Sequence, residues 1–158
     1  VQEYEQRAGI TISELTVDGL NSPKARMKLN FRKPVDSGGD FLYICPTIVP
    51  FIEKNPFTSQ KRQLPVEFSY PYRYRIIVSL MLPEGYTVEE LPKSQRLSAC
   101  DEGIACTMQL QQQGALMQCL FEFDLSRIIF PATEYTDLSA FYGFVMDMCN
   151  SRIVLKKS

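Results

Sequence analysis

Nucleophilic or metal-binding chemistry in this chain would rest on its five cysteines, Cys45, Cys100, Cys106, Cys119 and Cys149. They form no CxxC pair, and the 158 residues include no histidine. Structural zinc sites take closely spaced cysteine and histidine ligands, so this spacing argues against a metal site. A cysteine nucleophile needs a neighbouring base, and the chain has no histidine to supply one. We therefore expect no catalytic residue, metal or cofactor, and expect most cysteines to be small buried side chains.

Paired carboxylates are the other acid–base chemistry that the sequence offers. Glu89 and Glu90 are adjacent, so on a strand they point to opposite faces and do not converge. Glu122 and Asp124 are two residues apart and share a face, as the two carboxylates of a glycosidase must. Two carboxylates on the outward face of a strand are more often solvated charges, and we favour that interpretation.

Three tyrosines, Tyr70, Tyr72 and Tyr74, alternate with Arg73 and Arg75. An aromatic stripe on one face of a strand can stack sugar rings or bases. The stripe has the parity of the apolar residues that follow it, which favours a core position for most of it. These tyrosines are nevertheless the candidate ligand-binding residues of this sequence.

Alternating apolar and polar residues predict many short strands. The predicted strands cover residues 10–17, 25–32, 41–45, 64–70, 74–82, 86–91, 94–99, 106–110, 116–123 and 153–155. Residues 74–82 are apolar on both faces, which predicts a central strand covered on each side. Gln113-Gly114 predicts a hairpin turn between the strands on either side.

One segment breaks the alternation, because apolar residues recur at helical spacing from Leu138 to Cys149. We expect Thr133 to cap this helix and Asn150 to end it. Gly143 is expected to mark a close approach to a strand, since glycine inside a helix is otherwise unfavourable. The elements together predict a mostly β fold, an antiparallel β-sandwich of immunoglobulin-like size with one C-terminal α-helix.

The remaining segments are connections. Residues 1–9 are polar and are expected to lead from an upstream domain into a single domain over residues 10–158. Residues 46–63 contain prolines and an apolar patch. We expect this 46–63 loop to lie on the sandwich surface or at one end, with a helical turn.

Composition excludes several functional classes. A formal net charge of -1 gives no electrostatic case for binding nucleic acid or an anionic membrane. The wholly apolar runs are only a few residues long, so no membrane insertion is expected. The chain begins at Val1 without a methionine or a signal peptide, which suggests a fragment of a longer protein.

Several segments together carry a family resemblance. They are NPF at residues 55–57, PVEFSYP at 65–71, LPEGYTVEELP at 82–92, IIFPATEY at 128–135 and IVLKK at 153–157. The chain resembles, over roughly residues 10–157, the C-terminal β-sandwich domain of unknown function in Bacteroidetes-type bacterial envelope proteins. In that family the domain follows a transglutaminase-like domain. The resemblance implies a periplasmic or cell-envelope location and an upstream transglutaminase-like partner in the same chain, and it assigns no catalytic residue here.

Two functions therefore remain open besides an enzyme, which the missing histidine disfavours. The first is a non-catalytic accessory domain that docks on, or positions, its neighbour in a larger transglutaminase-like or protease-like envelope protein. The second is a glycan- or peptide-binding module that uses the tyrosines at 70–74 or the 46–63 loop.

Overall fold

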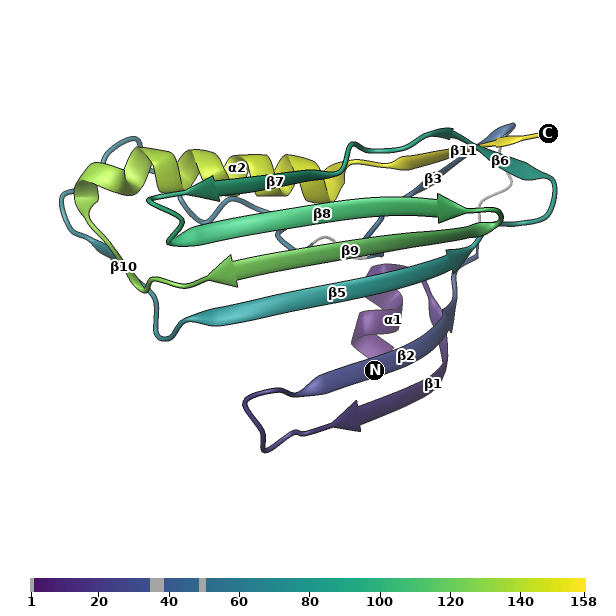
Figure 1. The fold of residues 1–158 in the computed structure, drawn as a ribbon, viewed down its shortest axis with the longest axis horizontal. Helices are drawn as coiled ribbons and strands as arrows, with labels where there is room; N and C mark the ends of the chain where they lie inside the picture. The colour runs from purple at the N-terminus through teal and green to yellow at the C-terminus, as the bar shows by residue number, and fades with distance from the viewer. Residues whose placement is uncertain (1, 35–38, 49–50) are drawn as a thin grey trace. The chain divides into compact units, whose positions relative to one another are not determined.

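The computed structural model describes residues 2–34, 39–48 and 51–158 (Figure 1). The chain forms two compact units, Val1–Gly39 and Asp40–Ser158. The sequence instead suggested residues 1–9 as a connection and 10–158 as one domain, and that division stays a prediction.

The first unit is a short helix followed by a β-hairpin. Helix α1 spans Gln2–Ala8, where a connection was expected, and strands β1 (Thr11–Asp18) and β2 (Arg26–Arg32) pair antiparallel. The carboxylate of Glu5 in the helix accepts a 2.7 Å hydrogen bond from the Ile12 N–H. Lys33 Nζ, just after β2, donates to the Ala8 carbonyl at 2.6 Å. The start of β1 and the end of β2 are therefore both hydrogen-bonded to α1.

The second unit is built on a four-stranded antiparallel sheet in the order β5-β9-β8-β7. The strands span Tyr72–Met81 (β5), Gln95–Ala99 (β7), Ile104–Gln113 (β8) and Leu116–Leu125 (β9). The alternation predicted for β9 is confirmed, because Met117, Cys119, Phe121 and Phe123 are all at most 2% exposed. Gly114 takes the positive φ of 59° that the β8–β9 hairpin requires. One face of the sheet, the inner face, is therefore the core, and the other is the outer face.

A three-stranded sheet covers one end of the inner face. It has the order β3-β11-β6, with β3 at Phe41–Ile44, β6 at Tyr86–Glu90 and β11 at Ile153–Lys157. Leu42, Ile153 and Leu155 of this sheet pack with Met117 of β9 in one buried cluster. A two-stranded pair, β4 (Val66–Glu67) with β10 (Ile129–Phe130), completes the β structure of the described residues. The predicted mostly β, antiparallel fold with a C-terminal helix is confirmed.

Helix α2 (Tyr135–Asn150) covers the other part of the inner face (Figure 1). The Phe123 ring lies 6.2 Å from Phe141 and 5.9 Å from Tyr142 on this helix. The predicted cap at Thr133 is wrong, because a 3-10 turn at Ala132–Glu134 places Glu134 at the N-cap, with no side-chain cap bond. Among the described residues, no helix is long and apolar enough to cross a bilayer.

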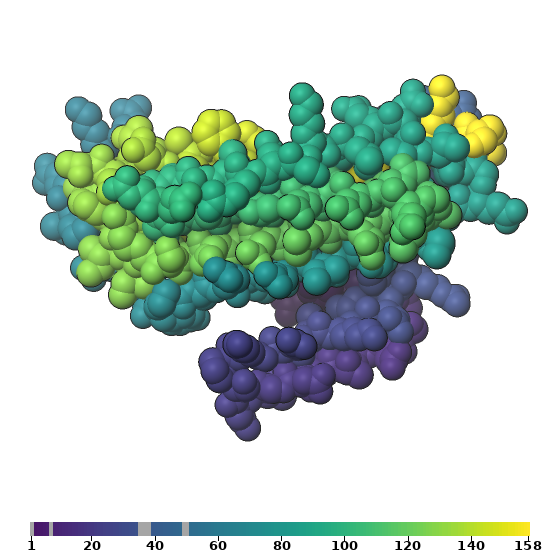
Figure 2. Space-filling model, viewed as in Figure 1, coloured from purple at the N-terminus to yellow at the C-terminus, as the bar shows by residue number. Residues whose placement is uncertain are grey.

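Two predictions about close packing are wrong. A Cβ built on Gly143 would meet nothing nearer than Asn55 Nδ2 at 3.9 Å, so this glycine marks no close approach to a strand. Strand β5 was expected at the centre of a sheet, but it forms an edge. Val78 is buried on its inner side, whereas Ile77 and Met81 on the outer side are 68% and 72% exposed. The outer face of the sheet is at the molecular surface in Figure 2, with β8 and β9 in green.

Candidate functional site

The predicted tyrosine stripe lies along the inner side of β5 and the residues just before it. The Tyr72 ring stacks on Phe123 at 5.8 Å between centroids, with an interplanar angle of 20°. The Tyr74 ring stacks on Phe51 at 4.9 Å and 25°. Tyr70 meets Tyr72 edge-on at 6.2 Å. The stripe is therefore continuous with the aromatic core, as its parity indicated.

The three tyrosines differ in what they offer a ligand. Tyr70 is 66% exposed and Tyr74 is 46% exposed, whereas Tyr72 is half-buried. Burial, followed by the neighbouring Tyr70, raises the pKa of Tyr72 above its ordinary value of 10.0. The structure thus places Tyr72 at the margin of the core and leaves parts of Tyr70 and Tyr74 accessible. Their role in ligand binding stays a prediction.

The 46–63 loop, the other predicted ligand site, is tied to α2 by its NPF motif. The Asn55 amide donates to the Ser139 carbonyl at 2.9 Å and accepts a 2.9 Å bond from the Phe57 N–H. The Ser139 hydroxyl in turn donates to the Phe57 carbonyl at 2.9 Å.

Aromatic side chains of the same loop enter the core. Phe51 lies 5.4 Å from Phe121 and 4.9 Å from Phe123, between ring centroids. Phe57 packs edge-on against Tyr142 at 4.9 Å. Residues 53, 54, 56 and 58–63 are exposed, so this part of the loop lies at the surface as expected. Thr47 and Ile48 are buried instead, and the expected helical turn is absent from the described residues of the loop, which exclude 49 and 50. This packing could not be predicted from the sequence, because the proline-containing loop has no periodic apolar pattern that would mark its buried residues.

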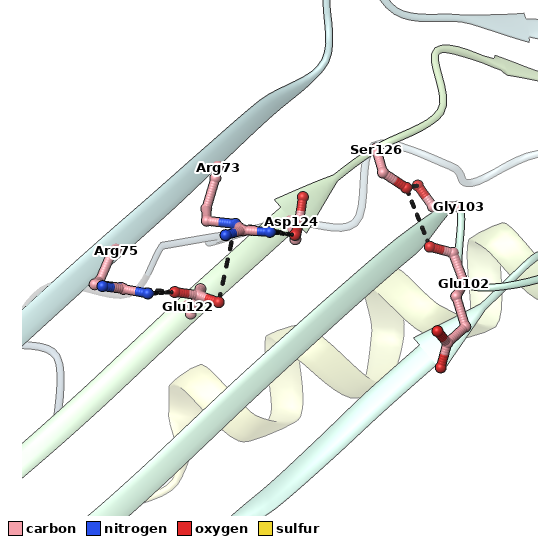
Figure 3. A network of polar contacts seen from close by, with 7 residues as sticks. All are labelled: Arg73, Arg75, Glu102, Gly103, Glu122, Asp124 and Ser126. Atoms are coloured by element: carbon pink, nitrogen blue, oxygen red, sulfur yellow. Dashed lines mark hydrogen bonds and ion pairs between the residues drawn. The ribbon is translucent and has the colours of Figure 1, made fainter. Parts of the chain in front are cut away.

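The carboxylate pair on the outer face is occupied by arginines (Figure 3). Glu122 and Asp124 share a face of β9, as predicted, and they pair with Arg75 and Arg73 of β5 respectively. The Arg75 Nε–Glu122 Oε2 distance is 2.6 Å, and the Arg73 Nε–Asp124 Oδ2 distance is 3.0 Å. The hydrogen bond to Asp124 raises the pKa of Arg73. Each carboxylate therefore forms a cross-strand ion pair with an arginine. Exposed ion pairs of this kind contribute little to the free energy of unfolding.

A strained turn joins β7 to β8 at the other side of Figure 3. Cys100, Asp101 and Glu102 have φ values of 55°, 54° and 59°, a left-handed conformation that costs energy for side chains other than glycine. The Ser126 hydroxyl supports the turn by donating to the Glu102 and Gly103 carbonyls at 3.1 and 3.2 Å.

Sequence reasoning also missed Arg127, which organises the base of this turn. Its guanidinium pairs with Glu134 at the start of α2 and lies 4.6 Å from the Phe130 ring centroid. Its Nε is buried without a hydrogen-bond partner among the described residues, and faces Gly103. No spacing rule identifies such an arginine, because its partners come from three different elements.

The cysteines are free thiols, and all but Cys100 are buried. Burial raises the pKa of Cys106 and of Cys119 from 9.0 to about 12. The pKa of Cys100 is raised to about 11, first by burial and then by the charge of Glu134. The predicted burial of most cysteines is confirmed. Within the described residues, no three histidine, cysteine or acidic side chains are grouped as a metal site would require.

Comparison with known proteins gives one family match and one similar solved structure. A family model described as "Domain of Unknown Function with solved-structure structure (DUF3858)" matches residues 40–155. The crystal structure of a protein from Parabacteroides distasonis, described as a "putative protease", is similar with a TM-score of 0.60 and 15% sequence identity. That match covers 75% of this chain and 24% of the other, so this chain spans about a quarter of its length. No curated protein matches.

Proposed function

The chain belongs to the DUF3858 family, and on that premise we propose that its second unit is a non-catalytic accessory domain of a larger bacterial envelope protein. In this proposal the domain docks on, or positions, a transglutaminase-like or protease-like neighbour in the same chain. The observation that carries the proposal is that the side chains able to do acid–base or nucleophilic chemistry are either buried or already paired. Burial raises the pKa of Cys106 and of Cys119 to about 12, so these two thiols stay protonated at neutral pH, and Glu122 and Asp124 are engaged by arginines.

The size of the similar structure supports a place in a longer chain. The match covers 75% of this chain but only 24% of the other protein, so the shared fold occurs there together with other parts. The family match begins at residue 40, where the second unit also begins. The second unit therefore has the bounds of a domain that can be joined to a neighbour.

An exposed aromatic pair offers a docking surface. Phe41 and Tyr43 lie two residues apart on β3, so they share a face, and Tyr43 is 66% exposed. Lys156 of the neighbouring strand β11 lies over the Phe41 ring at 5.7 Å. Aromatic residues are enriched at the core of protein–protein interfaces.

The test uses the intact protein with its neighbouring domain, in which docked domains should unfold together. We expect Tyr43→Ala to separate one calorimetric transition into two, and the exposed Ile129→Ala on β10 to leave the single transition intact. Separate transitions already present in the unaltered protein would overturn the docking proposal.

The exposed parts of Tyr70 and Tyr74 favour the second candidate, a glycan- or peptide-binding module. Binding to glycan and peptide arrays should then be lost in Tyr74→Ala and retained in Tyr43→Ala. Array binding that is unchanged in Tyr74→Ala would reject these tyrosines as the site.

A further inference from the structure

We propose that β5 is a self-association edge, through which two copies of the chain pair antiparallel and join their four-stranded sheets into one continuous sheet. This inference goes beyond the accessory role and does not depend on it.

The free edge of β5 is long and regular. The ten residues of Tyr72–Met81 pair with β9 in one unbroken register, and β5 has no second strand partner among the described residues. The backbone N–H and C=O groups on its outer edge are therefore available to another strand.

Protein sheets usually protect such an edge, and β5 lacks the usual protections. Edges are commonly blocked by a short strand, a bulge, a proline or a lysine. Residues 72–81 contain neither proline nor lysine, and their register shows no bulge. Their only charges, Arg73 and Arg75, are neutralised by carboxylates of β9. Residues 76–81 carry no charge at all.

The outer-face side chains of β5 are complementary to themselves. In the antiparallel register that places Ile77 opposite its own counterpart, Arg75 lies opposite Ser79 and Arg73 opposite Met81. Like charges are thus kept apart, and the exposed Ile77 side chains cover each other at the two-fold axis. Shifting the register so that Arg75 meets its own counterpart would bring like charges together, which disfavours that alternative.

The inner-face side chains fit the same register. Ile76 lies opposite Val78, and Tyr74 lies opposite Leu80, so every one of these cross-strand pairs is apolar. The inner face is therefore compatible with this alignment, and a second copy supplies the partner without any further sequence.

We expect a weak dimer, because pairing of one strand covers less surface than a standard stable interface. Sedimentation of the full chain from about 1 µM to about 1 mM should show a reversible monomer–dimer equilibrium. Ile77→Lys puts two lysines at the axis and should weaken association at least about tenfold. The matched control Ile129→Lys changes an exposed isoleucine on β10 and should not weaken it. A monomer at every concentration, or equal weakening by both variants, would overturn the proposal.

Cross-linking tests the register independently of affinity. In the proposed register the two copies of residue 77 have Cα atoms about 4.5–5.5 Å apart, within reach of a disulfide. The two copies of residue 81 are about 26 Å apart along the strands. Under mild oxidation Ile77→Cys should give a covalent dimer and Met81→Cys should not, above the background from the native cysteines. A dimer that forms with Met81→Cys as readily as with Ile77→Cys would contradict this register.

Discussion

Replacing Phe141 with alanine tests how α2 is held on the inner face of the sheet. The Phe141 side chain is 3% exposed and lies against Phe123 and Tyr142. Removing a buried phenylalanine costs about 3–5 kcal/mol, from lost transfer free energy and the cavity left behind. Alanine is the better helix former by roughly 0.5 kcal/mol, so the net loss should be about 2.5–4.5 kcal/mol.

Phe144→Ala is the matched control, because Phe144 lies on the same helix and is 60% exposed. It carries the same gain in helix propensity without the buried contacts. Its unfolding free energy should therefore change by less than about 0.5 kcal/mol. Both values come from urea unfolding followed by circular dichroism. A loss below about 1 kcal/mol for Phe141→Ala would refute the docking of α2 through this ring.

Three further outcomes follow from the structure. Gly143→Ala should stabilise the protein by up to about 1 kcal/mol, because the added Cβ would have ordinary van der Waals contact with Asn55 Nδ2 at 3.9 Å. Urea unfolding measures this change, and a loss of stability would contradict the prediction. Gly103→Ala should destabilise it by about 1–3 kcal/mol in the same measurement, because its Cβ would lie 3.0 Å from Arg127 Nε and from a backbone carbonyl. The pKa values of Cys106 and Cys119 are raised to about 12 in the fold, so the folded state keeps protons that the unfolded state loses from about pH 9. Stability should therefore be complete below pH 9 and fall towards pH 12, and unfolding of Cys106→Ala across this range should show a shallower fall.

The periodicity of apolar residues predicted correctly those elements that bury one side and expose the other. Strand β9 alternates strictly and buries one side, and the apolar spacing after Leu138 gave α2 with its buried face. Periodicity does not specify position within a sheet, which is why β5 was expected at the centre. Ile77 and Met81 are exposed, but isoleucine and methionine are also the residue types of a covered strand face, so the sequence could not show that this side is uncovered.

Alternation along the strand also predicted part of the candidate site, namely the side of β5 on which each side chain lies. The parity of the tyrosine stripe and the opposite side for Arg73 and Arg75 follow from alternation alone. The long-range contacts could not be predicted, because they join segments far apart in the chain. The hydrogen bonds of Asn55 to Ser139 and the ion pair of Arg127 with Glu134 depend on how the loop and α2 meet the sheet.

The central claim, that this domain has no chemistry of its own, is tested most directly by assaying the purified chain for amide hydrolysis and transamidation while its thiols are titrated. Buried thiols with raised pKa values should react slowly with an alkylating reagent until the protein unfolds. The account predicts no turnover and slow native-state modification. Rapid modification of one native cysteine, together with turnover that is lost when that cysteine is replaced by alanine, would contradict it.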